Sequence, residues 1–191
     1  TRPSSSLTTL IWMRRSKEHP TTSQPTPGEF VRVLRDARAE ADEVIAVLLS
    51  ARLSGTHQSA VAATKVAGID RVSCIDSGTA SLGLGMRALR AAELAESGWS
   101  AADIVTELVR LRAQSGCFIT VDRFDNLLRS GRVTRGKAWL AGMLNVKPIL
   151  GLDGDGAVVP LDRVRGSTNV VPRVLSLLEK QLSPKPAAVR F

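Results

Sequence analysis

Residues 44–49, Val-Ile-Ala-Val-Leu-Leu, form the stretch that decides the fold. Apolar residues follow one another here without alternation, which is typical of a strand covered on both faces inside a parallel sheet. A polar turn comes next at residues 50–55, then a helical segment at residues 56–67 that ends before Gly68, then a second apolar run at residues 72–75. Strand, helix and strand in this order predict a β-α-β unit, and therefore an α/β fold class.

The segments on either side of this unit continue the alternation of helices and strands. Before the first strand, apolar residues recur at three- and four-residue steps from Phe30 to Ala41, which predicts a helix with one apolar face. After the second strand, a polar turn at residues 76–81 leads into another helix. Ser100 and Asp103 then resemble a capping box, which predicts the start of a further helix.

A change of pattern indicates two domains. We expect a strand at residues 117–121 to close the first unit and the boundary to fall near residues 116–122. This division gives an N-terminal α/β domain with a parallel sheet at residues 21–118 and a partial second α/β domain at residues 119–191. Residues 1–20 form an atypical lead-in that we place outside the fold.

The second half of the chain predicts a hairpin between helical segments. A short Arg-rich helical region is expected at residues 123–144. The apolar runs at residues 146–150 and 157–161 are joined by an Asp-Gly-Asp-Gly turn, which predicts a β-hairpin. A helix at residues 167–182 follows, and residues 187–191 are interpreted as the opening of a strand.

Composition limits the class of protein and the compartment. The 26 Lys and Arg residues exceed the 18 Asp and Glu residues, for a net charge of +8, while 43% of the residues are apolar, which favours a globular chain over a disordered one. No apolar run approaches the roughly 18 residues of a membrane span. Cys74 and Cys117 each lie in a short apolar run, so we expect two buried thiols in a reducing cytoplasm. Two Cys and two dispersed His residues do not supply the ligands of a zinc site, so we expect no metal.

The polar turn after the first strand is the main candidate site. Ser54, Gly55 and Thr56 fit a seat for a carboxylate or phosphate, because the glycine admits a close backbone approach and the hydroxyls donate hydrogen bonds. The alternative is that Ser54 or Thr56 only caps its helix. His57 raises the further hypothesis of a nucleophilic Ser54 with His57 as its base, although no third group is evident to orient the imidazole.

Two further features concern phosphates and nucleic acids. Residues 83–85 read Gly-Leu-Gly, a fragment of the dinucleotide fingerprint that we interpret as packing glycines, and the sequence contains no P-loop. The basic stretch from Arg129 to Lys137 is typical of a solvated face or of a surface that attracts an acidic or phosphorylated partner. With 4% aromatic residues and no Tyr, the chain has little on which to stack bases, so we do not expect nucleic acid as its partner.

Several short motifs lie in a fixed order along the chain. They are Thr-Ser-Gln-Pro-Thr-Pro-Gly-Glu-Phe at 22–30, Leu-Ser-Gly-Thr at 53–56, Ile-Asp-Ser at 75–77, Ala-Ser-Leu-Gly-Leu-Gly at 80–85, Ser-Gly-Arg-Val at 130–133, Asn-Val-Lys-Pro-Ile-Leu at 145–150 and Val-Arg-Gly at 164–166. Their order and spacing resemble those of the DegV family of fatty-acid-binding proteins, over about residues 21–182.

The resemblance implies a DegV-like two-domain α/β architecture that buries one long-chain fatty acid in an apolar pocket between its domains. It also implies a carrier rather than an enzyme, with no cofactor, which presents the fatty-acid carboxylate to a separate kinase subunit. By the same resemblance, Thr22 and Ser54 hold that carboxylate, and Arg132 lies near the opening where a partner docks. The other candidate contacts with the pocket or partner are Ser23, Gly55, Thr56 and Ser81.

The chain departs from the family pattern at three points. The family begins with a strand carrying an Asp-Ser-Thr-like turn and ends with a half-domain that contains a His near the carboxylate. Neither feature is found in this sequence, so we expect a form truncated at both ends. Position 57 is His where the family usually has an aromatic residue. Two other functions stay open: an enzyme acting on a small phosphorylated or carboxylated metabolite and, less favoured, a nucleic-acid-binding protein.

Overall fold

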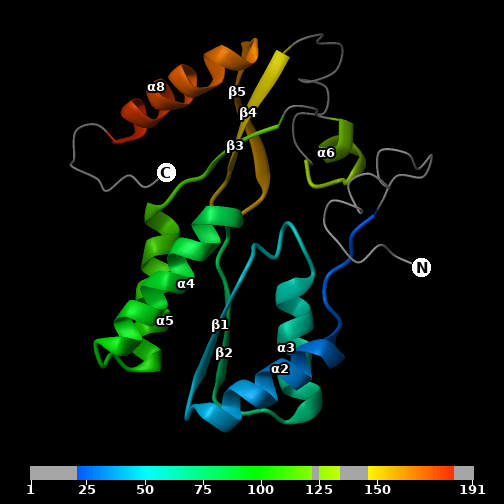
Figure 1. The fold of residues 1–191 in the computed structure, drawn as a ribbon, viewed down its shortest axis with the longest axis vertical. Coiled ribbons are helices and arrows are strands. Elements are labelled where there is room, and N and C mark those ends of the chain that lie inside the picture. Colours follow the sequence, from blue (N-terminus) through cyan, green and yellow to red (C-terminus); the bar gives the residue numbers. More distant parts are fainter. Residues whose placement is uncertain (1–20, 122–124, 134–145, 183–191) are drawn as a thin grey trace.

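The computed structural model describes residues 21–121, 125–133 and 146–182. A parallel pair of strands and an antiparallel three-stranded sheet organise this part of the chain, and the two lie at opposite ends of an elongated molecule (Figure 1). The predicted α/β class is confirmed. The lead-in at residues 1–20, the strand expected at residues 187–191 and most of the predicted Arg-rich helical region lie outside the described residues.

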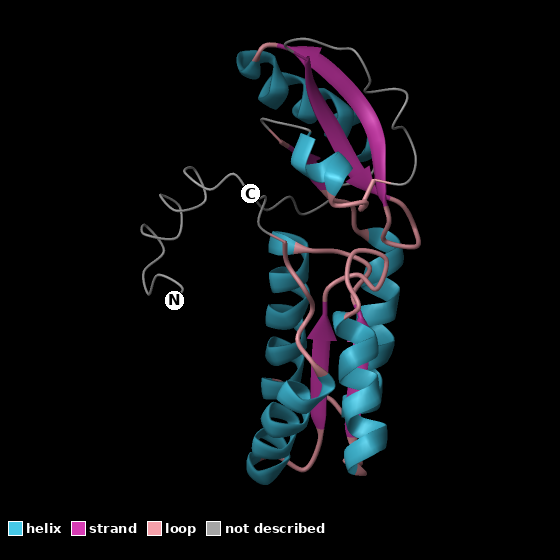
Figure 2. Cartoon of the chain, turned by 90° about the vertical axis from the view of Figure 1, so that its right-hand side faces the viewer, coloured by secondary structure: helices cyan, strands magenta, loops and turns pink. Residues whose placement is uncertain are grey.

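The first sheet is the predicted β-α-β unit. β1 (Val44–Leu48) and β2 (Val72–Asp76) pair in parallel, with Val44 opposite Val72 and Leu48 opposite Asp76. Helices cover both faces of the pair (Figure 1, Figure 2). These are α2 (Pro27–Glu40) and α3 (Thr56–Ala67) on one face, and α4 (Ser81–Glu96) and α5 (Ala101–Gln114) on the other.

The helix boundaries follow from local capping. Thr26 and Glu29 form a capping box at the start of α2, in which the Glu29 backbone N–H donates to the Thr26 hydroxyl. Ser100 caps α5 by accepting from the Asp103 backbone N–H, which confirms the predicted start of that helix. α3 ends at Gly68, whose φ of 60° is a left-handed conformation that glycine adopts without strain.

We call the first sheet with helices α2 to α5 the first region, and the second sheet with its helices the second region. The core of the first region lies between β1, β2 and the helix pair α4–α5. Ala91, Leu94, Ile104 and Leu108 are buried there, and side chains from both strands pack against them. The strands themselves are only partly buried along their whole length. The expected cover on both faces is present, and the strands stay partly exposed because each strand of a two-stranded sheet is also an edge strand.

The second sheet contains the predicted hairpin. β4 (Val146–Leu152) and β5 (Val158–Arg165) pair antiparallel, and a short 3₁₀ turn (Ser167–Asn169) leads into α8 (Val170–Leu182). Between β3 (Phe118–Thr120) and β4 the structure also describes a short helix, α6 (Asp125–Arg129). Val133, Leu150 and Val158 form the buried centre of this region, and Leu53 of the first region packs against them.

The strand predicted at residues 117–121 belongs to the second sheet rather than the first. β3 (Phe118–Thr120) pairs antiparallel with β4, with Phe118 opposite Gly151 and Thr120 opposite Ile149. The expectation that this strand closes the first unit was wrong. An apolar run predicts a strand but carries no information about its partner, and here the free side of the hairpin supplies that partner.

Candidate functional site

The turns that follow β1 and β2 are joined into one structure, as the parallel pairing predicts. The Asp76 carboxylate accepts hydrogen bonds through Oδ1 from the backbone N–H groups of Ala51 at 3.2 Å and Gly78 at 2.8 Å. The Ser50 N–H donates to the Thr79 carbonyl at 2.8 Å. One carboxylate therefore fixes both turns at the carboxyl edge of the sheet.

The turn around Ser54, at residues 53–56, leads into α3 and is called the Ser54 turn below. The first turn of α3 behind it has backbone N–H groups without an acceptor. Gly55 is the N-cap of α3 and provides no side-chain cap. Ser54 Oγ lies 2.8 Å from Thr56 Oγ1 and accepts from the Thr56 N–H at 3.3 Å, so neither hydroxyl occupies the N-cap position. Among the described residues, the N–H groups of His57 and Gln58 have no hydrogen-bond acceptor. This turn can accept an anion without a cation.

The segment that carries Thr22 and Ser23 lies beside this turn (Figure 1). The Gln24 side chain packs directly on Gly55, where an added Cβ would come within 3.0 Å of Gln24 Nε2. Thr22 and Ser23 are exposed. The close approach at Gly55 therefore brings two of the hydroxyl-bearing motifs together, with 30 residues between Gln24 and Gly55 in the sequence.

Arg132, which follows α6, reaches the same turn from the second half of the chain. Its Nε donates to the Leu53 carbonyl at 3.3 Å, and its Nη1 donates to the Ser130 carbonyl at 2.7 Å. Leu53 is the residue immediately before Ser54, and its side chain packs into the core of the second region. The structure thus places Arg132 at the junction of the two sheets, next to the Ser54 turn.

Ser81 lies apart from this group. It begins α4 with a φ of 53°, an uncommon conformation for a residue other than glycine, and is exposed. Within the described chain it makes no hydrogen bond to the Ser54 turn. The packing interpretation of the Gly-Leu-Gly motif holds for Gly83, where a Cβ would overlap Thr79, but not for Gly85, which faces open space.

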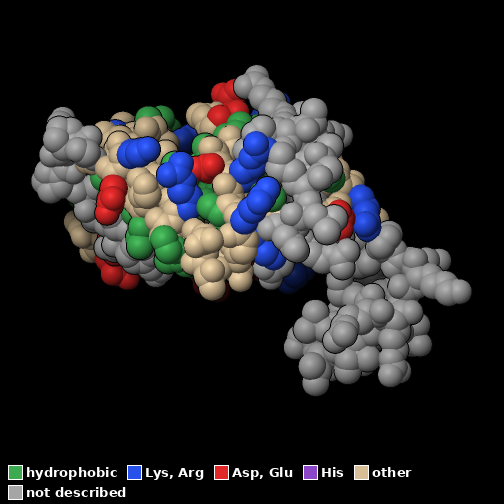
Figure 3. Space-filling model, turned by 90° about the horizontal axis from the view of Figure 1, so that it is seen from above, with side chains coloured by type: hydrophobic (Ala, Val, Ile, Leu, Met, Phe, Trp, Pro, Cys, Tyr) green, Lys and Arg blue, Asp and Glu red, His purple; other side chains and the backbone are tan. Residues whose placement is uncertain are grey.

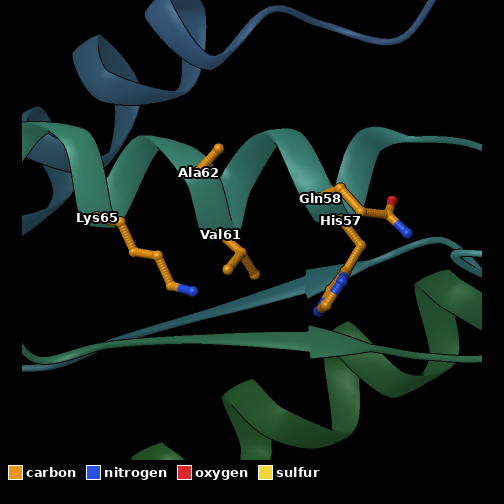
Figure 4. Close-up of a pocket in the computed structure, with 5 residues that line it drawn as sticks. All are labelled: His57, Gln58, Val61, Ala62 and Lys65. Carbon is orange, nitrogen blue, oxygen red and sulfur yellow. The ribbon is translucent and has the colours of Figure 1, made fainter.

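The hypothesis of a Ser54–His57 nucleophile and base is not supported by the geometry. His57 Nε2 lies 3.3 Å from the Cys74 carbonyl oxygen. A carbonyl only accepts, so this nitrogen carries a proton and donates it. Ser54 Oγ pairs with Thr56 instead. His57 lines an open groove of about 310 Å³ on α3, with Gln58, Val61, Ala62 and Lys65 (Figure 4).

Burial affects the two cysteines in the same way. Cys74 and Cys117 are free and partly buried, and burial raises the pKa of both thiols. Of the residues that the structure describes, no three His, Cys, Asp or Glu side chains are grouped to hold a metal ion. In the same residues, no helix has the length and apolar character to cross a bilayer.

Sequence reasoning missed a half-buried cluster of charges at the junction. Arg112 of α5 pairs with Asp76, with 3.4 Å between Arg112 Nη1 and Asp76 Oδ2. Arg87 of α4 is 7% exposed and donates to the Ser115 hydroxyl. Burial lowers the pKa of Arg87, the nearby Arg112 lowers it further, and Asp76 acts in the opposite direction. An Asp that ends a strand was the signal that could have led to this cluster.

The basic stretch is described only as far as Val133, so Arg135 and Lys137 lie outside the described residues. Seen from the end that carries the second sheet, Lys and Arg side chains are interspersed with acidic and apolar ones (Figure 3). The described surface on this side is therefore mixed rather than uniformly basic.

Comparison with known proteins places the chain in a family. A family model described as an uncharacterised protein of the DegV family matches residues 8–190. A DegV domain-containing protein from Deinococcus radiodurans is 40% identical over 171 residues, which cover 90% of this chain and 60% of that protein. Protein DegV from Bacillus subtilis is 35% identical over 181 residues, which cover 93% of this chain and 64% of that protein.

Solved structures agree with the sequence comparison. A DegV family protein from Thermus thermophilus, described by its fatty acid binding, superimposes with a TM-score of 0.83 at 38% identity, over 92% of this chain and 62% of that one. DegV from Bacillus subtilis, described as a fatty acid binding protein, gives a TM-score of 0.76 at 34% identity, over 91% and 61%. The chain thus spans about three fifths of the length of these relatives. On sequence and fold together, it belongs to the DegV family.

Proposed function

We propose that this chain binds a long-chain fatty acid at the junction of its two sheets, with the carboxylate at the Ser54 turn. The observation that carries this proposal is the convergence of three elements on that turn: the start of α3, whose N-cap Gly55 offers no side chain, Gln24, which packs on Gly55, and Arg132. The fatty acid binding described for the Thermus and Bacillus relatives supports it.

The apolar tail supplies most of the affinity in this proposal. At roughly 0.8 kcal/mol per buried CH₂, a chain of about sixteen carbons contributes on the order of 12 kcal/mol before the costs of association. Two hydroxyl hydrogen bonds to a carboxylate contribute less than that. The hydroxyls of Thr22 and Ser54 therefore fix the orientation of the fatty acid, with Ser23, Gly55 and Thr56 as further contacts at the same turn.

The carboxylate end would then be presented to a kinase subunit, with Arg132 near the docking surface. Arg132 uses Nε and Nη1 on backbone carbonyls of Leu53 and Ser130, so it also holds the turn that carries Ser54. We further propose that the two domains divide near residues 116–122, where the chain passes from α5 to β3.

Extraction of the purified protein with organic solvent, followed by mass spectrometry, tests the proposal. We expect one fatty acid per chain. A folded protein that neither carries nor takes up fatty acid would overturn it. Activity towards a small carboxylated metabolite without any partner protein would support an enzyme instead.

A double variant tests the head-group residues. Thr22→Val with Ser54→Ala removes both hydroxyls, and we expect faster fatty-acid release from a protein that stays folded. Thr26→Val is a matched control, because the Thr26 hydroxyl belongs to the α2 capping box and not to the Ser54 turn. Equal release from the double variant and the wild type would contradict the assignment of Thr22 and Ser54.

A further inference from the structure

The turn of the β4–β5 hairpin is seated on the strand ends of the first sheet. The Ser50 hydroxyl, which is buried, donates to the Gly156 carbonyl at 2.8 Å. Gly156 has a φ of 85°, and a Cβ at this position would overlap Ser50 Oγ and the backbone of Gly78. The contact therefore has room for a glycine and for nothing larger.

A single guanidinium group spans this contact. Arg112 Nη1 donates to the Asp76 carbonyl at 3.1 Å and pairs with the Asp76 carboxylate. Arg112 Nη2 donates to the carbonyls of Gly154 at 3.4 Å and Asp155 at 3.2 Å. One side chain of α5 thus bonds to the end of β2 and to the hairpin turn at the same time.

The guanidinium of Arg112 is less exposed than that of Arg110, which forms the other described ion pair of the same helix. The side chains of Arg112 and Asp76 are 30% and 21% exposed. Arg110, two residues away, is 52% exposed, and its partners among the described residues, Glu107 and Gln114, belong to α5 itself. Arg110 therefore links residues of one helix, whereas Arg112 links α5 to the end of β2 and to the hairpin turn.

Besides the passage of the chain from α5 to β3 and the contact of the Cys117 thiol with Thr79, two attachments join the sheets on the described residues. The first is the contact of Leu53 with the second core, together with the Arg132 hydrogen bond to its carbonyl. The second is the seat of the hairpin turn on Ser50, Asp76 and Arg112. Two separate attachments fix an orientation, whereas either one alone leaves a hinge.

We propose that Arg112 is a positioning residue that sets the angle between the two sheets and so controls exchange of the ligand held at their junction. The part about exchange rests on the proposed function. Without Arg112 the hairpin turn loses two hydrogen bonds and keeps its contact with Ser50, so the second sheet is held less firmly against rotation about Leu53. A ligand between the sheets then leaves faster, although the groups that hold its carboxylate are unchanged.

The test compares Arg112→Gln with Arg110→Gln, which removes the same charge from the same helix. Two measurements are made: the rate at which bound fatty acid transfers to phosphatidylcholine vesicles, and the distance between spin labels at Val66 on α3 and Val171 on α8. These two positions are 85% and 66% exposed. The labelled protein carries Ala in place of Cys74 and Cys117.

For Arg112→Gln we expect about tenfold faster transfer and a broadened distance distribution, and for Arg110→Gln neither change. Arg112→Lys keeps the charge but cannot bridge both partners, so it should restore the behaviour only in part. A folded Arg112→Gln protein with wild-type transfer and wild-type distances would overturn the proposal.

Two other outcomes are also decisive. If the wild type carries no fatty acid, the proposed function fails, but the spin-label distances still judge the role of Arg112. If Arg112→Gln does not fold, Arg112→Lys takes its place, because it keeps the charge but cannot bridge Asp76 and the hairpin turn together. A distance distribution broader than that of the wild type in the Arg112→Lys protein supports the proposal, and wild-type distances overturn it.

Discussion

The two sheets of this protein are covered in different ways. In the first region, helices lie on both faces of β1 and β2, and Leu94, Ile104 and Leu108 are at most 3% exposed. In the second region, α8 packs on the sheet, but none of its residues is fully buried. The core of the second region includes a contact with Leu53, which belongs to the first region. Its order therefore depends on attachments to the first region, whereas the first region carries its own cover.

The largest effect is expected for Gly156→Ala, which tests the attachment of the second region to the first. The alanine would need a φ of 85° and would overlap Ser50 and Gly78, so we expect a loss of about 2–4 kcal/mol in the free energy of unfolding. Gly154→Ala is the control, since a Cβ there meets open space and should change stability by less than about 0.5 kcal/mol. Urea denaturation followed by circular dichroism measures both. Equal midpoints for the two variants would show that the hairpin turn is not seated as described.

Leu53→Ala tests how far the second region depends on its contact with Leu53 of the first region. Removing a partly buried leucine from this core should cost about 2 kcal/mol, and hydrogen exchange should increase in β4 and β5 more than in β1 and β2. Leu82→Ala, at a side chain that is 71% exposed, serves as the control. Faster exchange in the first sheet alone would refute the dependence of the second region on Leu53.

Thr26→Ala tests whether a change in a helix of the first region leaves the second region unaffected. Loss of the N-cap hydroxyl of α2 should cost about 1 kcal/mol of stability, with the effect confined to α2 and its neighbours. Thr26→Ser keeps the hydroxyl and should stay close to the wild type. Hydrogen exchange by mass spectrometry measures both variants, and an increase in the second sheet would contradict the comparison.

The smallest expected effect is a pH dependence in the second region. The Arg163 backbone N–H and the Arg173 guanidinium hold the pKa of Asp162 below its ordinary 3.8. A depressed carboxyl pKa stabilises the fold above the unfolded pKa, and this stability is lost as pH falls through the folded value. Because the Arg173 side chain is 38% exposed, the contribution stays below about 1 kcal/mol.

Thermal unfolding between roughly pH 2 and pH 6 measures this contribution. Asp162→Asn should lower the melting temperature at the upper end of this range and leave it nearly unchanged at the lower end. A variant that is equally destabilised at both ends would show that the carboxylate charge plays no part in holding α8.

Local features of the fold could be predicted from the sequence. The apolar run at residues 44–49, the left-handed Gly68 and the Ser100 cap each act within a few residues, so their structural effect is visible in a short window. The sheet to which β3 belongs depends on β4, more than 20 residues further along the chain, and was predicted wrongly. Strand pairing of this range is decided by tertiary packing.

The candidate site was predictable in the same partial way. The meeting of the turns after β1 and β2 follows from parallel pairing alone. The packing of Gln24 on Gly55 and the bond from Arg132 to Leu53 join segments far apart in the sequence, and no local pattern encodes them. For the same reason the role of Arg112 could not be predicted from its place in a helix, because its partners Asp76 and the hairpin turn lie far from it in the sequence.

The bond between His57 and Cys74 has a consequence for self-association. Arg71 and Ser77 bond across to β1, so the alternation of a strand turns the carbonyls of Cys74 and Asp76 toward the opposite edge of β2. Both of those carbonyls are occupied, by His57 and by Arg112. An exposed edge with free acceptors can recruit a strand from another molecule and start aggregation. His57 of α3 and Arg112 of α5 thus occupy two acceptors on this edge of β2. The substitution His57→Ala would leave the Cys74 carbonyl available to a strand of a neighbouring chain.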